Sequence, residues 1–341
     1  MEAVFLKLLN ISINTSYLAL AVIFLRFVLK KAPKNLRCVL WGLVALRLVL
    51  PFSLESVLSL LPSAEPVPPG ILLAETPEIQ SGIPVVNHAI NQILSENLSP
   101  IPGNSVNPMQ IAVFFASILW LAGIAIMLFY MLVSYLRLRK NVREAIILQD
   151  NVLLCDKIEM PFLLGILRPK IYLPSAMNET DLQYVLLHEK AHLKRKDHIW
   201  KLLGFLLLSV YWMNPILWVS YWLFCRDIEL ACDEKVLKSC GPAIKKPYAQ
   251  ALLRCSAPSN SITACPLSFG FIGVKSRIKN VLHYKKPPVW IVLLAVAVCI
   301  AAAVCLLTDP VKREENNVFS PQKGEILIQH DMLYISPPYF S

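Results

Sequence analysis

The residues with the clearest chemistry are His188, Glu189 and His192, which form the pattern H-E-x-x-H. Residues four apart on a helix lie one turn apart on the same face, so both imidazoles can bind one zinc ion. Glu189 then faces the water at the metal and can act as general base. The pattern is typical of a metallopeptidase with zinc as its cofactor.

A helix must carry this pattern, and the surrounding sequence predicts one. Thr180 and Gln183 have the spacing of a capping box, and apolar residues then recur at helical spacing at positions 182, 185, 186 and 193. The alternative is a surface helix whose two histidines bind nothing.

A catalytic zinc ion has three protein ligands as a rule, so the third must come from elsewhere in the chain. Glu229 is our candidate, and Asp233, four residues later on the same helical face, is the candidate partner that orients a histidine. Cys232 is a competing ligand, but it lies on a different part of the helical turn. We therefore rank Glu229 above Cys232.

The composition predicts a membrane protein around this site. Of 341 residues, 56% are hydrophobic and only 16% are charged, which argues against both a purely water-soluble protein and a disordered one. Four segments are apolar enough for membrane spans: about 4–29, 36–54, 109–136 and 289–307. Arg26 and Arg47 lie inside these spans. Arg26 is expected to snorkel toward the interface, whereas Arg47 is either a snorkelling residue or part of a functional site.

The charge pattern predicts the orientation of the spans. Lys and Arg cluster after the first and third spans, whereas the outer loop at about 53–108 has none from Ser53 to Pro108. The positive-inside rule then places both termini outside and residues 137–286 in the cytoplasm. The basic residues lie beside apolar stretches, so direct nucleic-acid binding is not expected from the net charge of +10.

The apolar stretch 199–224 lies between the two halves of the proposed site. A single crossing would place Glu229 and the histidines on opposite sides of the membrane. Because Pro215 interrupts the stretch near its centre and each arm is too short to cross, we predict a re-entrant helical hairpin with its bend near Asn214. Upstream, NVLLCDKI and PFLLGILRPKIYLP predict short strands; residues 162–173 are either a substrate-binding edge or a structural sheet.

The order of these motifs resembles the BlaR/MecR-type membrane metallopeptidases, the beta-lactam sensor-transducers. The resemblance rests on PFLLGILRPKIYLP, LLHEKAHLKRKDH, ELACDEKVL and PLSFGFIGVKSRIKNVLHYKKPP, together with the order of spans. It implies a gluzincin-like zinc endopeptidase with His188, His192 and Glu229 as ligands and Glu189 as base. It also implies self-cleavage near Ser268–Phe269 and a cytoplasmic repressor as substrate.

The expected architecture is mainly α: a multi-pass membrane protein with an inserted cytoplasmic α+β peptidase domain. Residues 1–136 hold three spans, 137–286 the peptidase domain with hairpin 199–224, 287–308 the last span and 309–341 an outer tail. Thirty-two residues from 310 onward are too few for the penicillin-binding sensor domain of the best-known members, so direct beta-lactam sensing is not expected.

The expected partners are a repressor-like protein and membrane lipid; self-association stays open. His198, Tyr172 and Tyr184 are candidate hydrogen-bond donors to the negatively charged oxygen of the transition state. Two other classes of function remain at this point: a housekeeping membrane protease resembling the heat-shock or prenyl-protein zinc peptidases, and a non-catalytic receptor in which zinc is structural.

Overall fold

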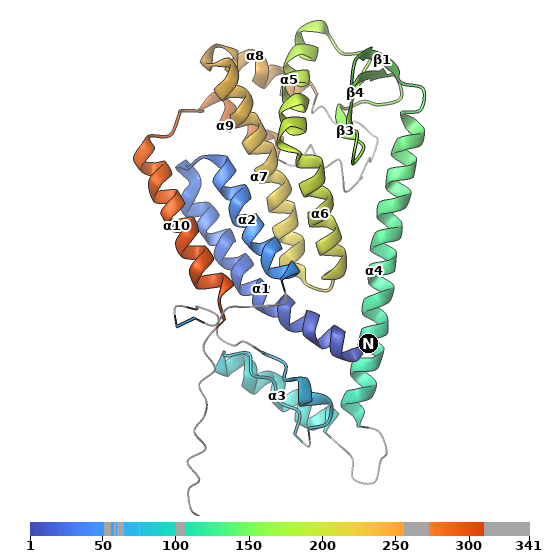
Figure 1. Ribbon diagram of the computed structural model, residues 1–341, viewed down its shortest axis with the longest axis vertical. Coiled ribbons are helices and arrows are strands. Elements are labelled where there is room, and N and C mark those ends of the chain that lie inside the picture. The colour runs from blue at the N-terminus through green and yellow to red at the C-terminus, as the bar shows by residue number, and fades with distance from the viewer. Residues whose placement is uncertain are drawn as a thin grey trace, which may run out of the picture. The chain divides into compact units, whose positions relative to one another are not determined.

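The computed structural model describes residues 1–50, 56–57, 59, 65–74, 76–99, 107–255 and 273–309. The chain divides into a compact unit, Met1–Val311, and a second unit, Lys312–Ser341, which lies outside the described residues. The described part is mostly helical, with one small sheet (Figure 1). The mainly α prediction is therefore confirmed.

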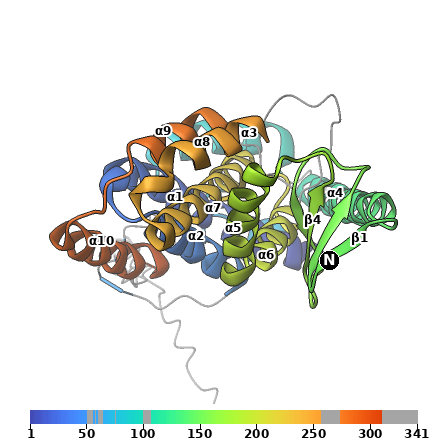
Figure 2. The same cartoon turned by 90° about the horizontal axis from the view of Figure 1, so that it is seen from above.

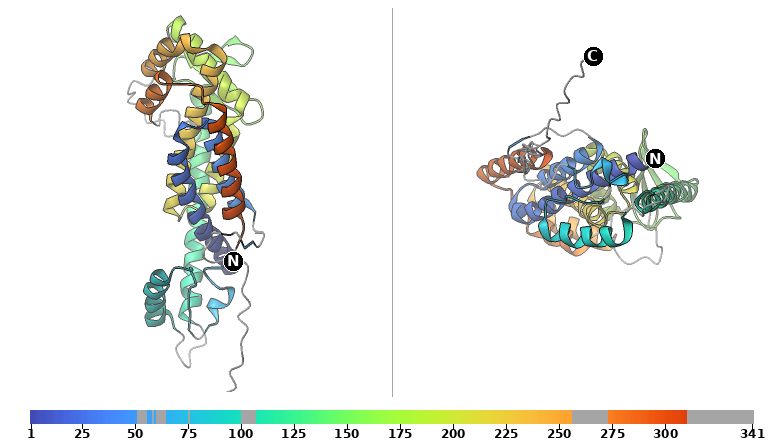
Figure 3. Two further views of the ribbon diagram at one scale, coloured as in Figure 1. Left: turned by 90° about the vertical axis from the view of Figure 1, so that its left-hand side faces the viewer. Right: turned by 90° about the horizontal axis from the view of Figure 1, so that it is seen from below.

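Three of the helices are long and apolar enough to cross a membrane. They are α1 (Glu2–Val28), extended to Lys31 by η1 (Leu29–Lys31), α4 (Pro108–Asn141) and α10 (Val289–Leu307), which match the first, third and fourth predicted spans. The second predicted span is α2 (Lys34–Val49), which has only 16 residues. Helix α2 packs against α1, α7 (Pro215–Cys240) and α10 (Figure 3).

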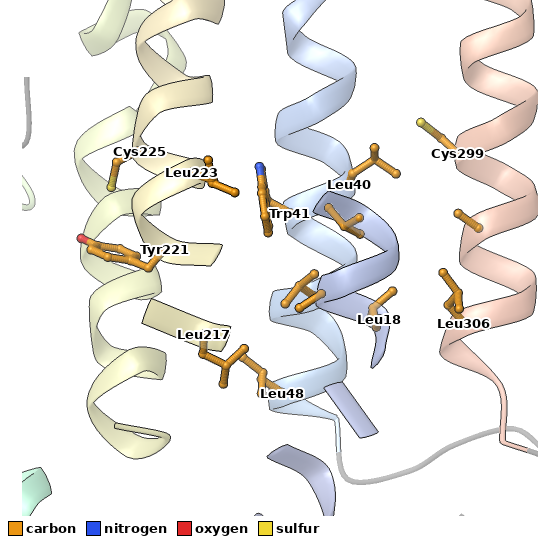
Figure 4. Close-up of a cluster of buried hydrophobic side chains, with 14 of the residues drawn as sticks. Leu18, Leu40, Trp41, Leu48, Leu217, Tyr221, Leu223, Cys225, Cys299 and Leu306 are labelled. Atoms are coloured by element: carbon orange, nitrogen blue, oxygen red, sulfur yellow. The ribbon is translucent and has the colours of Figure 1, made fainter. Parts of the chain in front are cut away.

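The main apolar core joins these helices. Leu18 of α1, Leu40 and Trp41 of α2, and Leu223 of α7 are buried together, and Cys299 of α10 closes the cluster on one side (Figure 4). Each fully buried large apolar side chain contributes roughly 1.5–3 kcal/mol to folding in an aqueous reference, which is an upper bound for residues that lipid would otherwise cover.

The segment between α2 and α4 contains η2 (Pro69–Leu72) and α3 (Pro84–Leu98). Its apolar residues Val67, Ile71 and Leu94 pack against Phe5 of α1 and Met109 of α4. The described part of this segment therefore caps the ends of α1 and α4.

The sheet has four short strands in the order β1-β2-β4-β3. Strands β2 (Val152–Cys155), β3 (Phe162–Leu164) and β4 (Lys170–Pro174) lie where the sequence predicted them, whereas β1 (Ile146–Gln149) was not predicted. Strand β4 pairs in parallel with β2 and antiparallel with β3. Gly165, with a φ of +113°, starts the turn after β3, in a backbone region that favours glycine.

Helices α6 (Asp197–Val210) and α7 form the hairpin that the apolar stretch predicted, with the bend at residues 211–214. Asn214 caps α7 by accepting from the Ile216 amide, and its Nδ2 donates to the Ser12 and Ser16 hydroxyls of α1 at 2.8 and 2.7 Å. The Tyr211 hydroxyl donates to the Leu48 carbonyl at 2.9 Å. The tip of the hairpin therefore lies beside the last turn of α2.

Helix α5 (Glu179–Arg195) carries the H-E-x-x-H pattern and lies between the sheet and the pair α8 (Lys245–Arg254) and α9 (Val274–Leu282) (Figure 2). A short helix, η3 (Pro242–Ile244), precedes α8. Asn178 is the N-cap residue, and no side chain caps this end, so the expected capping box at Thr180 and Gln183 is wrong. Lys196, with a φ of +57°, separates α5 from α6.

Gly123 of α4 lies against the ring of Trp212 at the hairpin tip, where a Cβ atom would collide with the ring. We expect Gly123→Ala to lower the free energy of unfolding by about 1–3 kcal/mol, because the α4–hairpin contact must open. Gly42→Ala, in open space on α2, is the matched control and should be neutral or stabilising. Thermal unfolding in detergent compares the two, and equal melting temperatures would contradict the packing.

Arg26 and Arg47, which lie within predicted spans, are buried and paired. Arg26 donates from Nε to Asp227 Oδ2 at 2.5 Å, and Trp41 Nε1 donates to the same oxygen at 2.9 Å. Arg26 is only 7% exposed, so the expectation that it snorkels is wrong: a carboxylate on α7 neutralises it inside the bundle. Arg47 pairs with Asp309 and links α2 to the end of α10.

Asp227 lies between two arginines, since Arg37 Nη1 is 3.6 Å from its other oxygen. Asp227→Asn should therefore destabilise the fold by about 3–5 kcal/mol, more than Arg26→Gln, which leaves Arg37 as a partner. The double variant should recover part of the loss. Thermal unfolding of the three variants measures the order, and a mild effect of Asp227→Asn alone would contradict it.

Candidate metal centre

Three ligand-type atoms from helices α5 and α7 meet at one end of the bundle. His188 Nε2 is 3.1 Å from His192 Nε2, and Glu229 Oε2 is 3.3 Å from the first and 3.5 Å from the second. All three side chains are buried. The structure therefore brings together the two histidines of α5 and the carboxylate of α7 that the sequence singled out.

These distances fit a zinc ion. Tetrahedral ligands at 2.0–2.1 Å from zinc lie about 3.3 Å from one another, close to the three distances observed. The spacing of the three atoms therefore suits a single metal ion, and the donor set of two imidazoles and a carboxylate suits zinc.

The remaining polar atoms of the ligands are held by other side chains. His192 Nδ1 bonds Asp197 Oδ2 at 2.7 Å, and His188 Nδ1 bonds the Tyr248 hydroxyl at 2.8 Å. These bonds turn both Nε2 atoms toward Glu229. Such partners fix the ring orientation and increase the basicity of a metal ligand.

Asp233 also lies where the sequence placed it, one helical turn beyond Glu229. Its Oδ1 is 3.3 Å from His188 Nδ1 and accepts a hydrogen bond from the Tyr248 hydroxyl at 2.7 Å. It thus reaches His188 both directly and through Tyr248. Lys201 of α6 holds the other oxygen of Glu229, with 2.9 Å between Nζ and Oε1.

The electrostatics of the cluster favour positive charge between the imidazoles. Burial is the largest influence on His188 and opposes its protonation, but the net effect of its surroundings, with Cys232 first among the groups that favour the charged form, raises the pKa of His188 to about 9. Burial also opposes ionisation of Glu229, yet Lys201, His192 and Arg277 hold the pKa of its carboxyl well below the ordinary value. An ionised carboxylate is the form that binds a metal.

Cys232 is a geometric rival for the third ligand position. Its Sγ and ligand atoms of His188 and His192 all lie within 4.8 Å of one another. Cys232 Sγ donates to the His188 carbonyl at 3.3 Å and also hydrogen-bonds both imidazoles. Glu229 Oε2 lies 3.3 and 3.5 Å from the two Nε2 atoms. Both residues are therefore candidates for the third ligand, and the ranking of Glu229 above Cys232 stays a prediction.

Four residues of the cluster were not predicted from the sequence: Asp197, Lys201, Tyr248 and Arg277. Asp197 had a signal in the sequence, because it is a carboxylate only five residues after His192. The others come from α6, α8 and α9 and have no motif of their own.

Glu189 is buried on α5 at 7% exposure. Ser268 and Phe269 lie outside the described residues.

The candidate donors to the transition state make other contacts. Tyr172 stacks on Phe162, with 5.6 Å between the ring centroids, and Tyr184 packs in the cluster around Tyr248. His198 bonds the backbone at Ile166. Arg277, by contrast, directly contacts two of the proposed ligands, with Nη1 3.2 Å from Glu229 Oε2 and Nη2 3.1 Å from His188 Nε2.

A buried cluster of metal ligands at one end of a bundle of membrane-length helices defines a membrane protein with a candidate metallopeptidase centre. The family comparison agrees: the model of the BlaR1 peptidase M56 family matches residues 6–281. The chain therefore belongs to this family of membrane metallopeptidases.

Curated relatives include a methicillin resistance protein and a regulatory protein. The chain is 25% identical over 198 residues to the methicillin resistance mecR1 protein of Staphylococcus aureus, covering 50% of this chain and 34% of that protein. It is 28% identical over 240 residues to the regulatory protein BlaR1 of Bacillus licheniformis, covering 62% of this chain and 39% of the relative. The matches thus span little more than a third of each relative.

Proposed function

We propose that this chain is a membrane-embedded zinc endopeptidase of signal transduction, which cleaves itself, a cytoplasmic repressor-like protein, or both, when an outer signal arrives. The observation that carries the proposal is the convergence of His188, His192 and Glu229 Oε2 at mutual distances of 3.1–3.5 Å. Membership of the M56 family and the similarity to the mecR1 and BlaR1 proteins support it.

The proposed topology has both termini outside and the metal centre at the inner membrane face. Residues 137–286 form a gluzincin-like α+β domain inserted between α4 and α10, and α6–α7 is its re-entrant hairpin. The hairpin supports this arrangement because α7 runs from the bend directly to Glu229, on the same side of the bundle as α5.

In this proposal, His188, His192 and Glu229 hold the zinc ion, with Asp197, Tyr248 and Asp233 orienting the histidines. The bound metal supplies Lewis acidity, which polarises the scissile carbonyl and acidifies the attacking water. Glu189 takes the proton from that water and passes it to the leaving amine. Strand β3 is the sheet edge beside α5 and can pair with an extended substrate.

Self-cleavage tests the proposal. The full chain, tagged at both ends, is reconstituted in lipid nanodiscs, loaded with zinc and followed by gel mobility and intact mass. We expect fragments 1–268 and 269–341, and we expect Phe269→Pro to block this cut without blocking cleavage of a repressor added in trans. Zinc-loaded protein that cleaves neither itself nor the repressor would favour the non-catalytic receptor, and indiscriminate degradation of unfolded proteins would favour the housekeeping protease.

A further inference from the structure

Arg277 of α9 is buried at 5% exposure and is held in place by Asp233. Two parallel hydrogen bonds join the pair, from Nε to Oδ2 at 2.9 Å and from Nη2 to Oδ1 at 2.8 Å. A fork of this kind fixes the plane of the guanidinium as well as its position. Arg277 is therefore a rigid cation in the wall of the metal centre.

The guanidinium also faces the proposed metal ligands. Its Nη1 lies 3.2 Å from Glu229 Oε2, and its Nη2 lies 3.1 Å from His188 Nε2. Glu229 Oε2 and His188 Nε2 are two of the three atoms that would bind the metal. Once their lone pairs bind zinc, they are poorer acceptors for Arg277, and its N–H groups then lie beside the place where a substrate carbonyl must approach.

We propose that Arg277 is a catalytic residue that donates hydrogen bonds to the scissile carbonyl oxygen as negative charge develops on it. The inference rests on the proposed peptidase function and names a role that the sequence left unassigned. Asp233 is then a positioning residue, which aims the guanidinium in addition to reaching His188.

The water oxygen bonds to the carbonyl carbon, the carbonyl π electrons move to its oxygen, and Arg277 binds the resulting negative charge. Glu189 receives the water proton and delivers it to the amide nitrogen as the C–N bond breaks, and the electrons on oxygen re-form the carbonyl of the new carboxyl group.

Other cations and donors of the cluster are engaged elsewhere. Lys201 Nζ contacts Glu229 Oε1, whereas Oε2 is the oxygen beside the imidazoles, and the Tyr248 hydroxyl contacts His188 on its Nδ1 side. Arg277 is the described cation that reaches the Nε2 side of His188.

The test uses full-length protein in nanodiscs with an 11-residue peptide of the 264–274 sequence as substrate. A phosphinate analogue of the same peptide, charged at the position of the scissile carbonyl, serves as the second probe. We expect Arg277→Gln to lower kcat by about 10²–10³-fold with little change in KM. We expect its affinity for the phosphinate to fall by a similar factor, while zinc content and affinity for uncleaved peptide stay at the wild-type level.

Arg254→Gln is the matched control, since Arg254 belongs to the adjoining helix α8 and pairs with Asp181 of α5. It should behave as wild type. Arg277→Lys keeps the charge but loses the paired hydrogen bonds to Asp233, and we expect its kcat to fall by at least about tenfold, less than in Arg277→Gln. If Arg277→Gln does not fold, Arg277→Lys tests the proposed role instead.

Wild-type kcat in Arg277→Gln, unchanged phosphinate affinity, or loss of zinc would each overturn the role of Arg277. A wild-type chain that holds zinc but cleaves nothing would instead overturn the proposed function, and this inference with it.

Discussion

Glu189→Gln is expected to abolish self-cleavage and peptide hydrolysis while leaving zinc bound. A glutamine keeps the size of the side chain but cannot accept the proton of the attacking water, so the rate should fall by at least about 10²–10⁴-fold. The measurement is gel mobility of the full chain after zinc loading, followed by kcat for the 264–274 peptide.

Glu179→Gln is the matched control, because Glu179 is exposed in the first turn of the same helix. It should cleave at the wild-type rate. If Glu189→Gln still cleaved itself, Glu189 would not be the general base; if it failed to bind zinc, its effect would be structural.

Zinc binding should distinguish Glu229 from Cys232. Glu229→Gln and His192→Ala each remove a proposed ligand, so we expect zinc content to fall from one equivalent to near zero after dialysis. Cys232→Ser should keep one equivalent, because the thiol bonds the His188 carbonyl and is not needed for the metal. Zinc content by mass spectrometry and competition with a chelator give the two readouts.

Asp197→Asn should have a zinc affinity between that of the wild type and that of the ligand variants in the same competition with a chelator. It leaves the ligands in place but weakens the bond that orients His192, and affinity should fall by about 10–100-fold. Loss of zinc from Cys232→Ser with retention in Glu229→Gln would reverse the proposed ligand set.

The sequence predicted those parts of the fold that local pattern determines. The long apolar segments form α1, α4 and α10, and helix α7 starts after a bend at Asn214–Pro215. Strand β1 was missed because Ile146–Gln149 is exposed along its whole length and gives no alternation.

The partners of buried charges could not be predicted from local pattern. Arg26 and Asp227 are 201 residues apart, and a hydropathy profile cannot show that one neutralises the other. For the same reason the sequence left the transition-state donor open. Arg277 lies 89 residues from His188 and 44 from Asp233, and only the fold of α9 against α7 brings it to the metal ligands.

X-ray absorption at the zinc edge of the wild-type protein tests the proposed ligand set. We expect one zinc ion per chain with only nitrogen and oxygen neighbours at about 2.0–2.1 Å, as two imidazoles, a carboxylate and an exchangeable oxygen require. A sulfur neighbour at about 2.3 Å would make Cys232 a ligand and contradict the account. Failure of the protein to hold one equivalent of zinc would contradict it as well.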